Sequence, residues 1–359
     1  MQIYSKIVAT GSFIPERKVS NNYFLNYIFY DQNGNLIDDT TENIIKKFYD
    51  ITNIEERRYA LPEQQTSDLA YLAAKDALES SGIDKETLDY IIVAHNFGDI
   101  SIENPQINIL PTIACKVKEK LKIKNPNTIA YDILFGCPGW LQGLIQANYY
   151  IKSGDAKRVM IIGADTLSRV SDVHDRDSMI YADGAGATIL EAIESNEPTG
   201  ILSHKTRTDA IEHAYNLWLG PTYNPEKQND KRLYIKMNGH KIYEYALTYV
   251  PEVVKQCIDE AKIEPLNIKK ILIHQANAKM DIAILKRILK AYKLKVDEEK
   301  MMPLTIGFLG NSSTATIPTM LDLIFKNKLK NHHVSSGDHI VFASVGAGMH
   351  INAIVYKIP

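Results

Sequence analysis

Apolar residues follow two kinds of spacing along the chain, and the two kinds alternate. From residue 66 they recur at the spacing of a helix up to a Ser-Gly stop at 81–82, and a continuous apolar run follows at 88–94. A short apolar run at 7–9 predicts another strand, and the polar stretch 31–43 predicts a loop. A helix, a turn and a strand that is apolar on both faces form the unit of a parallel sheet. The pattern therefore predicts an α/β fold with mostly parallel sheets.

The same succession returns later in the chain. Three segments of the first half match three segments of the second half in the same order, which indicates a duplicated fold. The matched pairs are 74–96 with 254–276, 132–140 with 306–314, and 153–165 with 336–348. We expect two similar α/β halves about a pseudo-twofold axis, an N-terminal half at 1–195 and a C-terminal half at 196–359.

A cysteine lies where an apolar run gives way to a helical pattern. Pro138, directly after Cys137, suits the first position of a helix, and Ser153-Gly154 supplies a stop. The first turn of such a helix offers free N–H groups and the positive end of the dipole, which lower the pKa of a thiol and can hold an oxyanion. This placement is typical of a nucleophile, although a lone cysteine is more often a small buried apolar residue.

The repeat adds two polar residues to the cysteine. It aligns Asn311 with Cys137 and puts His274 at the end of a strand whose counterpart carries Ala94. Taken singly, His274 is explained as a satisfied polar group and Asn311 as a helix cap. If the halves face each other, however, these strand ends converge on one pocket. Their joint occurrence favours a site built from cysteine, histidine and asparagine.

A glycine loop follows the strand expected at 340–345. Gly346, Ala347 and Gly348 either form a tight turn or let backbone N–H groups approach a reacting carbonyl. The sequence alone leaves both explanations open.

Composition limits the classes of function. The 359 residues, 45% of them hydrophobic, suffice for a large core, and a net charge of −2 lacks the basic excess of a nucleic-acid binder. Three cysteines without CxxC spacing indicate neither disulfides nor a metal site, and we interpret Cys115 and Cys257 as core packing. The N-terminus reads as a strand, and no run approaches the length of a membrane span. We expect a cytoplasmic protein without nucleic-acid or membrane partners.

The motifs resemble those of β-ketoacyl-ACP synthase III, a group of condensing enzymes in the thiolase superfamily. They are His274-Gln275-Ala276-Asn277, Gly310-Asn311-Ser312-Ser313, Asp183-Gly184-Ala185-Gly186-Ala187 and Gly136-Cys137-Pro138-Gly139. Further similarity extends from Lys6 to the C-terminus. The resemblance implies a thiolase-like fold, with the duplicated halves arranged in five αβαβα layers.

The resemblance also implies a mechanism. Cys137, ionised by its helix N-terminus and by His274, would attack an acyl thioester and hold the acyl group. A neutral His274 and Asn311 would donate hydrogen bonds to malonyl-ACP as it loses CO₂, and the carbanion would attack the acyl-Cys carbonyl. Backbone N–H groups of Cys137 and Ala347 would form the oxyanion hole. The family requires no metal or other cofactor, and acyl-CoA or acyl-ACP serves as substrate.

The resemblance implies two protein partners. Family members dock the acidic acyl carrier protein on basic residues after the histidine motif, and Lys279, Lys286 and Arg287 match them here. A solvated helix face gives the same charge pattern. Family members are dimers, so we expect a homodimer.

The chain departs from the family in several segments. Lys47 and Ile51 replace a Trp and an Arg that surround the adenine of CoA in members starting from acyl-CoA. The loop 95–110 is longer, and 204–234 shows little resemblance. Residues near the nucleophile also differ, at Pro138, Trp140, Ala347 and Met349. We expect these segments to shape the acyl pocket and its entrance, and we expect an unusual, larger acyl donor.

The function predicted is a decarboxylative Claisen condensation in fatty-acid or specialised polyketide or lipid biosynthesis. Three alternatives remain open: an alkylresorcinol-type ketosynthase that joins two acyl thioesters, an acyltransferase on the same scaffold, and a non-catalytic synthase subunit. Asn311 argues for condensation, because acyltransferase relatives tend to alter this residue. Retention of Cys137, His274 and Asn311 together argues against the non-catalytic subunit.

Overall fold

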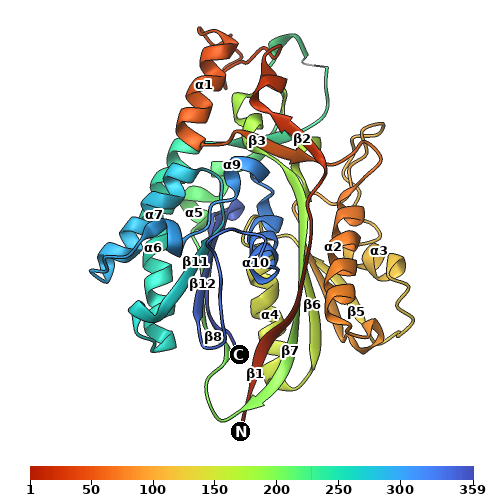
Figure 1. Ribbon diagram of the computed structural model, residues 1–359. Helices are drawn as coiled ribbons and strands as arrows, with labels where there is room; N and C mark the ends of the chain where they lie inside the picture. The colour runs from red at the N-terminus through yellow and green to blue at the C-terminus, as the bar shows by residue number, and fades with distance from the viewer. Residues whose placement is uncertain (228) are drawn as a thin grey trace.

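The computed structural model describes residues 1–227 and 229–359, and it contains two large β-sheets (Figure 1). The first sheet has the order β1-β7-β6-β4-β5, and the second has the order β11-β12-β13-β8. The strands of the first sheet are β1 (Gln2–Phe13), β4 (Tyr90–Ala94), β5 (Ile129–Ile133), β6 (Arg158–Thr166) and β7 (Asp183–Ser195). Those of the second are β8 (Gly200–Thr208), β11 (Ile268–Ile273), β12 (His339–Gly346) and β13 (His350–Lys357).

The strand orders confirm the duplication. The order β1-β7-β6-β4 in the first sheet corresponds to β8-β13-β12-β11 in the second, and only β5 has no counterpart among the described strands. The exact division of the chain at residues 195 and 196 stays a prediction.

The expectation of mostly parallel sheets is wrong, because both sheets are mixed. Strand β4 runs parallel to β5 and β6, and β11 runs parallel to β12, but the other neighbours are antiparallel. The helix-strand unit that the apolar pattern revealed makes only the parallel pairs. The antiparallel pairs come from direct returns of the chain, such as the three residues between β12 and β13.

Helices and sheets alternate in five layers, αβαβα (Figure 1). Helices α2 (Thr66–Ser81) and α3 (Ile113–Lys120) cover the outer face of the first sheet, and α6 (Gly239–Ala261) and α7 (Ala278–Ala291) cover that of the second. Helices α4 (Gly139–Ser153) and α10 (Thr316–Phe325) lie between the sheets, where their apolar side chains pack against strands of both. This central layer brings the starts of α4 and α10 close to the strand ends.

Helix ends follow the sequence signals closely. Helices α2 and α4 stop at Gly82 and Gly154, which both adopt the left-handed conformation that favours glycine. Helix α4 begins at Gly139, so Pro138 is the residue before the helix rather than its first member. Strand β1 extends well beyond residues 7–9, and the polar loop ends before residue 41, where α1 (Thr41–Thr52) begins.

Smaller elements cover one end of the five layers. A two-stranded sheet pairs β2 (Arg17–Ser20) with β3 (Glu56–Tyr59), and another pairs β9 (Leu217–Gly220) with β10 (Tyr234–Met237). The remaining α-helices are α1 (Thr41–Thr52), α5 (Ala210–His213), α8 (Glu298–Met301) and α9 (Ile306–Leu309). None of the helices in the described part of the chain has the length and apolar character that crossing a membrane requires.

The cysteine predictions are half right. Cys257 is fully buried, as is Ala77 at the matching place of the first half. Cys115 is exposed, because it lies on the solvent side of α3, so its interpretation as core packing is wrong. All three cysteines are free.

Candidate active site

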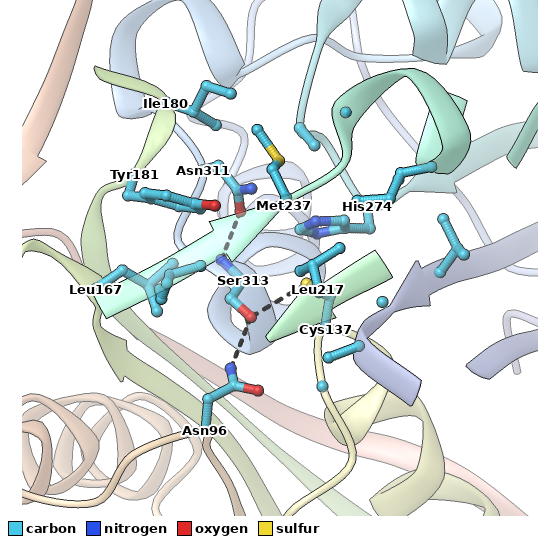
Figure 2. Close-up of a pocket in the computed structure, with 18 of the residues that line it drawn as sticks. Asn96, Cys137, Leu167, Ile180, Tyr181, Leu217, Met237, His274, Asn311 and Ser313 are labelled. Carbon is cyan, nitrogen blue, oxygen red and sulfur yellow. Dashed lines mark hydrogen bonds between the residues drawn. The ribbon is translucent and has the colours of Figure 1, made fainter. Parts of the chain in front are cut away.

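A cavity of about 340 Å³ opens where the central layer meets the strand ends (Figure 2). Cys137, His274 and Asn311 all line it, together with Gly346 and Ala347 of the glycine loop. The predicted convergence of the cysteine, histidine and asparagine on one pocket is therefore what the structure shows.

The cysteine elbow and the glycine loop are packed backbone against backbone. A side chain on Gly346 would place its Cβ 2.6 Å from the backbone nitrogen of Cys137, and one on Gly136 would lie 2.8 Å from the nitrogen of Ala347. The rings of Phe135 and His350 stack with centroids 4.0 Å apart, which adds a side-chain contact between the cysteine elbow and the glycine loop. Only glycine allows this approach, which brings the N–H groups of Cys137 and Ala347 into neighbouring loops.

The Cys137 thiol is protonated at neutral pH in this state, contrary to the expected thiolate. Burial raises the pKa of Cys137 to about 11, and the charge of Asp165 acts in the same direction. A hydrogen bond from Ser313 Oγ to Cys137 Sγ, 3.3 Å long, opposes this rise. The helix N-terminus remains favourable to a thiolate, but removal of the sulfur from water outweighs it in the free protein.

His274 lies directly after β11 and is buried. Its backbone N–H donates to the carbonyl of Ala343 on the neighbouring strand at 2.9 Å. Burial lowers the pKa of His274 to about 4, so the imidazole is neutral at neutral pH. A neutral ring can donate one hydrogen bond, as the sequence interpretation requires.

The residues after His274 hold the site in shape. Gln275 Oε1 accepts hydrogen bonds from the backbone of Thr305 and Ile306 at 2.8 and 3.0 Å, which ties β11 to the segment leading into α9. Asn277 Oδ1 caps the start of α7 by accepting from the backbone of Met280 at 3.1 Å. Two members of the histidine motif are therefore structural.

Asn311 follows the short helix α9, so the expectation that it ends a strand is wrong. Its backbone is bridged to the segment before β7, where it accepts from Ala182 at 2.8 Å and donates to Ile180 at 3.0 Å. Its side-chain oxygen accepts from the backbone of Ser313 at 2.8 Å. This bond fixes the amide orientation, and Figure 2 shows the amide nitrogen on the His274 side of the residue.

The rest of the cavity wall is mostly apolar. Its larger aliphatic members are Leu167, Ile180, Leu217, Leu219, Ile235, Met237, Ile242, Met280 and Val345. The predicted segment 204–234 contributes through β9, whereas the loop 95–110 contributes only Asn96 and Phe97. Trp140 and Met349 are buried in the cores instead, so their bulk does not shape the cavity and gives no support to a larger acyl donor.

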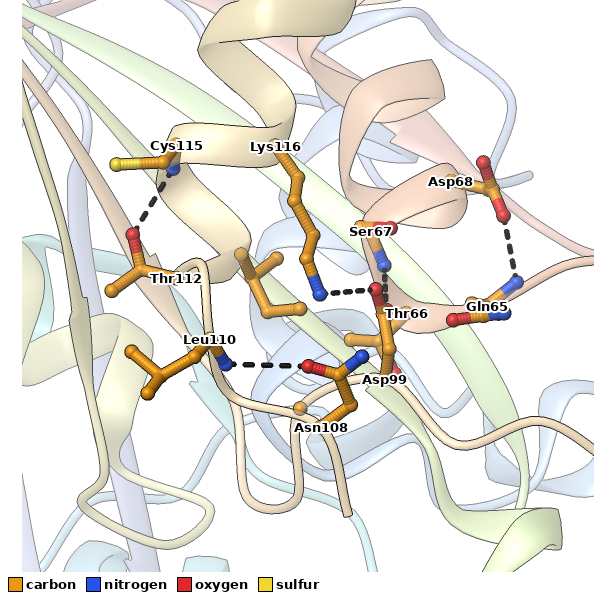
Figure 3. A network of polar contacts seen from close by, with 12 residues as sticks. Gln65, Thr66, Ser67, Asp68, Asp99, Asn108, Leu110, Thr112, Cys115 and Lys116 are labelled. Carbon is orange, nitrogen blue, oxygen red and sulfur yellow. Dashed lines mark hydrogen bonds and ion pairs between the residues drawn. The ribbon is translucent and has the colours of Figure 1, made fainter. Parts of the chain in front are cut away.

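The loop 95–110 is anchored near its start by polar contacts (Figure 3). Asp99 accepts from the backbone of Ser67 at 2.7 Å, at the start of α2, and pairs with Lys116 of α3 at 2.9 Å. His95 bonds Asp132 at 2.9 Å. These contacts fix the start of the loop, where Asn96 lies. The sequence offered no periodic signal for Asn96, and its role was missed.

The predicted carrier-docking residues differ in their contacts. Lys286 pairs with Glu298 at 3.7 Å, and Arg287 donates to the carbonyl of Leu247 at 2.7 Å. Lys279 is exposed and lies beside Met280, which lines the cavity.

The two positions near the expected CoA site face solvent on α1. Lys47 is paired with Asp39 at 2.6 Å, and Ile51 is exposed. Among the described residues, no group of three or more His, Cys, Asp or Glu side chains is arranged to hold a metal ion.

Comparison with known proteins assigns the family. Residues 131–210 match the 3-oxoacyl-[acyl-carrier-protein] synthase III family, and residues 258–358 match its C-terminal region. The β-ketoacyl-[acyl-carrier-protein] synthase III of Staphylococcus haemolyticus is 31% identical over 348 residues, covering 97% of this chain and 96% of that protein. The chain belongs to the 3-oxoacyl-ACP synthase III family.

Other synthases III agree with this assignment. The one from Pectobacterium atrosepticum is 30% identical over 96% of this chain and 97% of its own. The crystal structure of the Thermus thermophilus synthase III superposes with a TM-score of 0.79 at 28% identity and covers 99% of both chains. The thiolase-like fold is thereby confirmed, and the chain is an acyltransferase of the condensing type.

Proposed function

We propose that this synthase III forms an acyl-Cys137 intermediate and condenses it with malonyl-ACP, and that Cys137, His274 and Asn311 are its catalytic residues. The observation that carries the proposal is their placement around one cavity, with the cysteine two residues before the start of α4. A nucleophile and two hydrogen-bond donors in one apolar cavity suit acyl transfer followed by stabilisation of an enolate.

In the first step the Cys137 sulfur attacks the acyl thioester. A new sulfur–acyl bond forms, the old one breaks, and the proton of the thiol ends on the departing thiol of the carrier. The tetrahedral oxyanion accepts hydrogen bonds from the N–H groups of Cys137 and Ala347, whose loops are in contact. Ionisation of the buried thiol is the difficult part of this step, because its pKa lies near 11 before substrate binds.

In the second step malonyl-ACP loses CO₂ in the same cavity. Neutral His274 and Asn311 donate hydrogen bonds to the thioester oxygen as negative charge develops there. The resulting carbanion attacks the acyl-Cys carbonyl, the Cys137 sulfur leaves and takes up one proton, and β-ketoacyl-ACP is released. Two fixed neutral donors suit this step, because a charged imidazolium would be costly to bury. The proposal includes no metal or other cofactor.

The cavity and its surroundings support an aliphatic acyl group and a carrier protein. The apolar wall from β9 and β10 gives the acyl chain an apolar environment. Lys279, beside the cavity, is the docking residue best placed to attract an acidic carrier, whereas Lys286 and Arg287 already have partners. Solvent-facing Lys47 and Ile51 offer no aromatic platform for adenine, which favours acyl-ACP over acyl-CoA as donor.

We propose a homodimer that forms through β5. This strand lies at the edge of the first sheet, and no strand in the described part of the chain pairs with its outer row of backbone groups. Apolar side chains are exposed around it, at Ile129, Leu134, Ile109 and Leu110. Pairing of two copies would cover this surface and place a partner's loop close to the cysteine elbow. Light scattering after gel filtration tests the dimer, and a Leu134→Lys variant should be monomeric.

The test of the main proposal is the intact mass of the protein after incubation with acyl-ACP or acyl-CoA. An adduct should form in the wild type and in the control Cys115→Ala, and should be absent in Cys137→Ala. Addition of malonyl-ACP should then release CO₂ and remove the adduct. A stable adduct without CO₂ release would contradict the condensation, and no adduct with any donor would favour a non-catalytic subunit.

A further inference from the structure

Ser313 connects the nucleophile to a buried polar network (Figure 2). Its hydroxyl lies 3.3 Å from Cys137 Sγ and 2.9 Å from the side-chain nitrogen of Asn96. The same Asn96 nitrogen also bonds the carboxylate of Asp165 at 2.8 Å. A chain of hydrogen bonds therefore runs from Asp165 through Asn96 and Ser313 to the sulfur.

The direction of these bonds follows from the chemistry of the groups. An amide nitrogen can only donate, so the Ser313 hydroxyl accepts from Asn96. Its single proton is then left for the sulfur of Cys137. The orientation of Asn96 is fixed as well, because its backbone N–H donates to the other oxygen of Asp165 at 2.8 Å.

The far end of the chain is fixed by more donors. Asp165 is buried, and it accepts from the hydroxyl of Thr314 at 2.8 Å and from the backbone N–H of Thr314 at 3.3 Å. The N–H groups of Asn96 and Thr314 that contact this carboxylate can only donate, so they keep the direction of the chain fixed. The anchored base of the loop 95–110 holds Asn96 in place from the other side.

Ser313 also contacts Asn311, one of the two proposed hydrogen-bond donors of the site. Its backbone N–H holds the oxygen of Asn311, while its hydroxyl reaches Cys137. The residue adopts a left-handed conformation with φ of 52°, which directs both groups into the site.

We propose that Ser313, oriented by Asn96 and Asp165, is a positioning residue that donates a hydrogen bond to the Cys137 sulfur and promotes formation of the attacking thiolate. This inference rests on the proposed function in taking Cys137 as the nucleophile. Of the other titratable groups near the thiol, His274 is neutral and approaches from β11, and the hydroxyl of Tyr181 approaches from the segment before β7. The charge of Asp165 raises the pKa of the Cys137 thiol, and the hydrogen bond from Ser313 acts in the opposite direction.

The test measures the reactivity of the thiol without any acyl substrate. The rate of Cys137 alkylation by iodoacetamide is followed against pH by peptide mass spectrometry, in a Cys115→Ala background that removes the exposed thiol. In Ser313→Ala the midpoint of the pH profile should rise by about one unit, which corresponds to about tenfold slower alkylation at neutral pH. The plateau at high pH should stay unchanged, because only the ionisation is altered.

Two further variants separate the hydrogen-bond chain from a general loss of structure. Ser312→Ala removes the neighbouring buried hydroxyl, whose partner is Thr316, and should leave the midpoint in place. Asn96→Ala should shift the midpoint less than Ser313→Ala, and should add nothing when combined with it.

An unchanged midpoint in a folded Ser313→Ala protein would overturn the proposal, as would equal shifts in Ser313→Ala and Ser312→Ala. Should Ser313→Ala not fold, an Asn96→Ala midpoint equal to that of the wild type would overturn it instead. Alkylation does not depend on acyl transfer. A shifted midpoint in a protein that accepts no acyl group would therefore contradict the proposed function and leave this inference standing.

Discussion

Strands β4 and β11 occupy equivalent places in the two halves, and their ends carry different side chains. Residues 94–96 read Ala-His-Asn, and residues 274–276 read His-Gln-Ala. The middle residue makes a structural hydrogen bond in both halves. His95 bonds the side chain of Asp132, and Gln275 accepts from the backbone of the segment before α9. The two flanking positions are used in opposite ways.

The second half sends a polar side chain into the cavity from the first position, as His274, and the first half sends one from the third position, as Asn96. His274 faces the cavity as a donor, whereas Asn96 reaches the thiol through Ser313. In the proposed function the duplicated scaffold thus supports unequal chemistry, with the nucleophile in one half and the enolate donors in the other.

The two elbows differ in a related way. Helix α4 begins two residues after Cys137, whereas a turn of 3₁₀ helix at Ser313–Ala315 separates Asn311 from α10. That extra turn presents the N–H and the hydroxyl of Ser313 to the site. The second elbow therefore supports both its own asparagine and the cysteine of the first.

The largest effect on activity is expected when one of the two proposed hydrogen-bond donors of the second half is removed. Asn311→Ala should reduce condensation about 100-fold or more, because loss of one donor to a developing oxyanion has this size. Acylation of Cys137 should be retained, since Asn311 does not bond the sulfur. CO₂ release from malonyl-ACP and the intact mass of the protein measure the two steps separately.

Asn311→Asp is the matched variant. It keeps an oxygen for the backbone N–H of Ser313 but removes the donating amide, so condensation should fall as far as in Asn311→Ala. Condensation at the wild-type rate in the aspartate variant would show that Asn311 does not act as a donor.

The shared middle position should affect stability in both halves. Gln275→Ala leaves the N–H groups of Thr305 and Ile306 without a partner and should lower the free energy of unfolding by about 3 kcal/mol. His95→Ala should cost about 2 kcal/mol, because Asp132 keeps its bonds to the backbone of α3. Urea unfolding measures both, with exposed His333→Ala as control. A negligible change in the free energy of unfolding for either variant would show that His95 and Gln275 do not have equivalent structural roles.

The buried imidazole at the end of β11 should make stability depend on pH, whereas Ala94 at the matching end of β4 cannot. Burial lowers the pKa of His274 to about 4, so the unfolded chain, with an ordinary histidine pKa of about 6.5, binds the proton first. Its contribution to stability is complete above pH 6.5 and is lost as pH falls toward 4. Between pH 7.5 and 5.5 the wild type should lose about 1 kcal/mol more than His274→Gln in urea unfolding. Equal losses would contradict a buried neutral histidine.

The smallest effect is expected at a pair of matching core positions. Cys257 and Ala77 are both fully buried, and Ala77 shows that the scaffold accepts the smaller side chain at this place. Cys257→Ala should therefore cost less than about 1 kcal/mol in thermal or urea unfolding, because little volume is removed. A loss of several kcal/mol would mean that the two cores are packed differently.

Much of the fold could be predicted from residue patterns. The helix ends at Gly82 and Gly154 follow from glycine in the left-handed conformation, and the repeat follows from matched apolar runs. The antiparallel strands could not be predicted this way, because a buried strand is apolar in either direction. The neutral state of His274 agrees with expectation, while the protonated state of Cys137 does not, since burial depends on residues distant in sequence.

The site residues divide in the same manner. The convergence of Cys137, His274 and Asn311 on one cavity could be predicted, because the repeat aligns Asn311 with Cys137 and puts His274 at the end of a matched strand. The contacts of Asn96 and of the Ser313 hydroxyl could not. The role of these two side chains depends on a contact between residues 217 positions apart, which no local pattern records. The exposure of Cys115 was missed for a similar reason, because a helix face is assigned to solvent only by what packs against it.

The division of labour between the halves is tested most directly by the intact mass of His274→Ala. After incubation with an acyl donor, this variant should carry the same adduct on Cys137 as the wild type, and malonyl-ACP should neither remove the adduct nor release CO₂. Failure of His274→Ala to accept an acyl group, to the same extent as Cys137→Ala, would contradict the account.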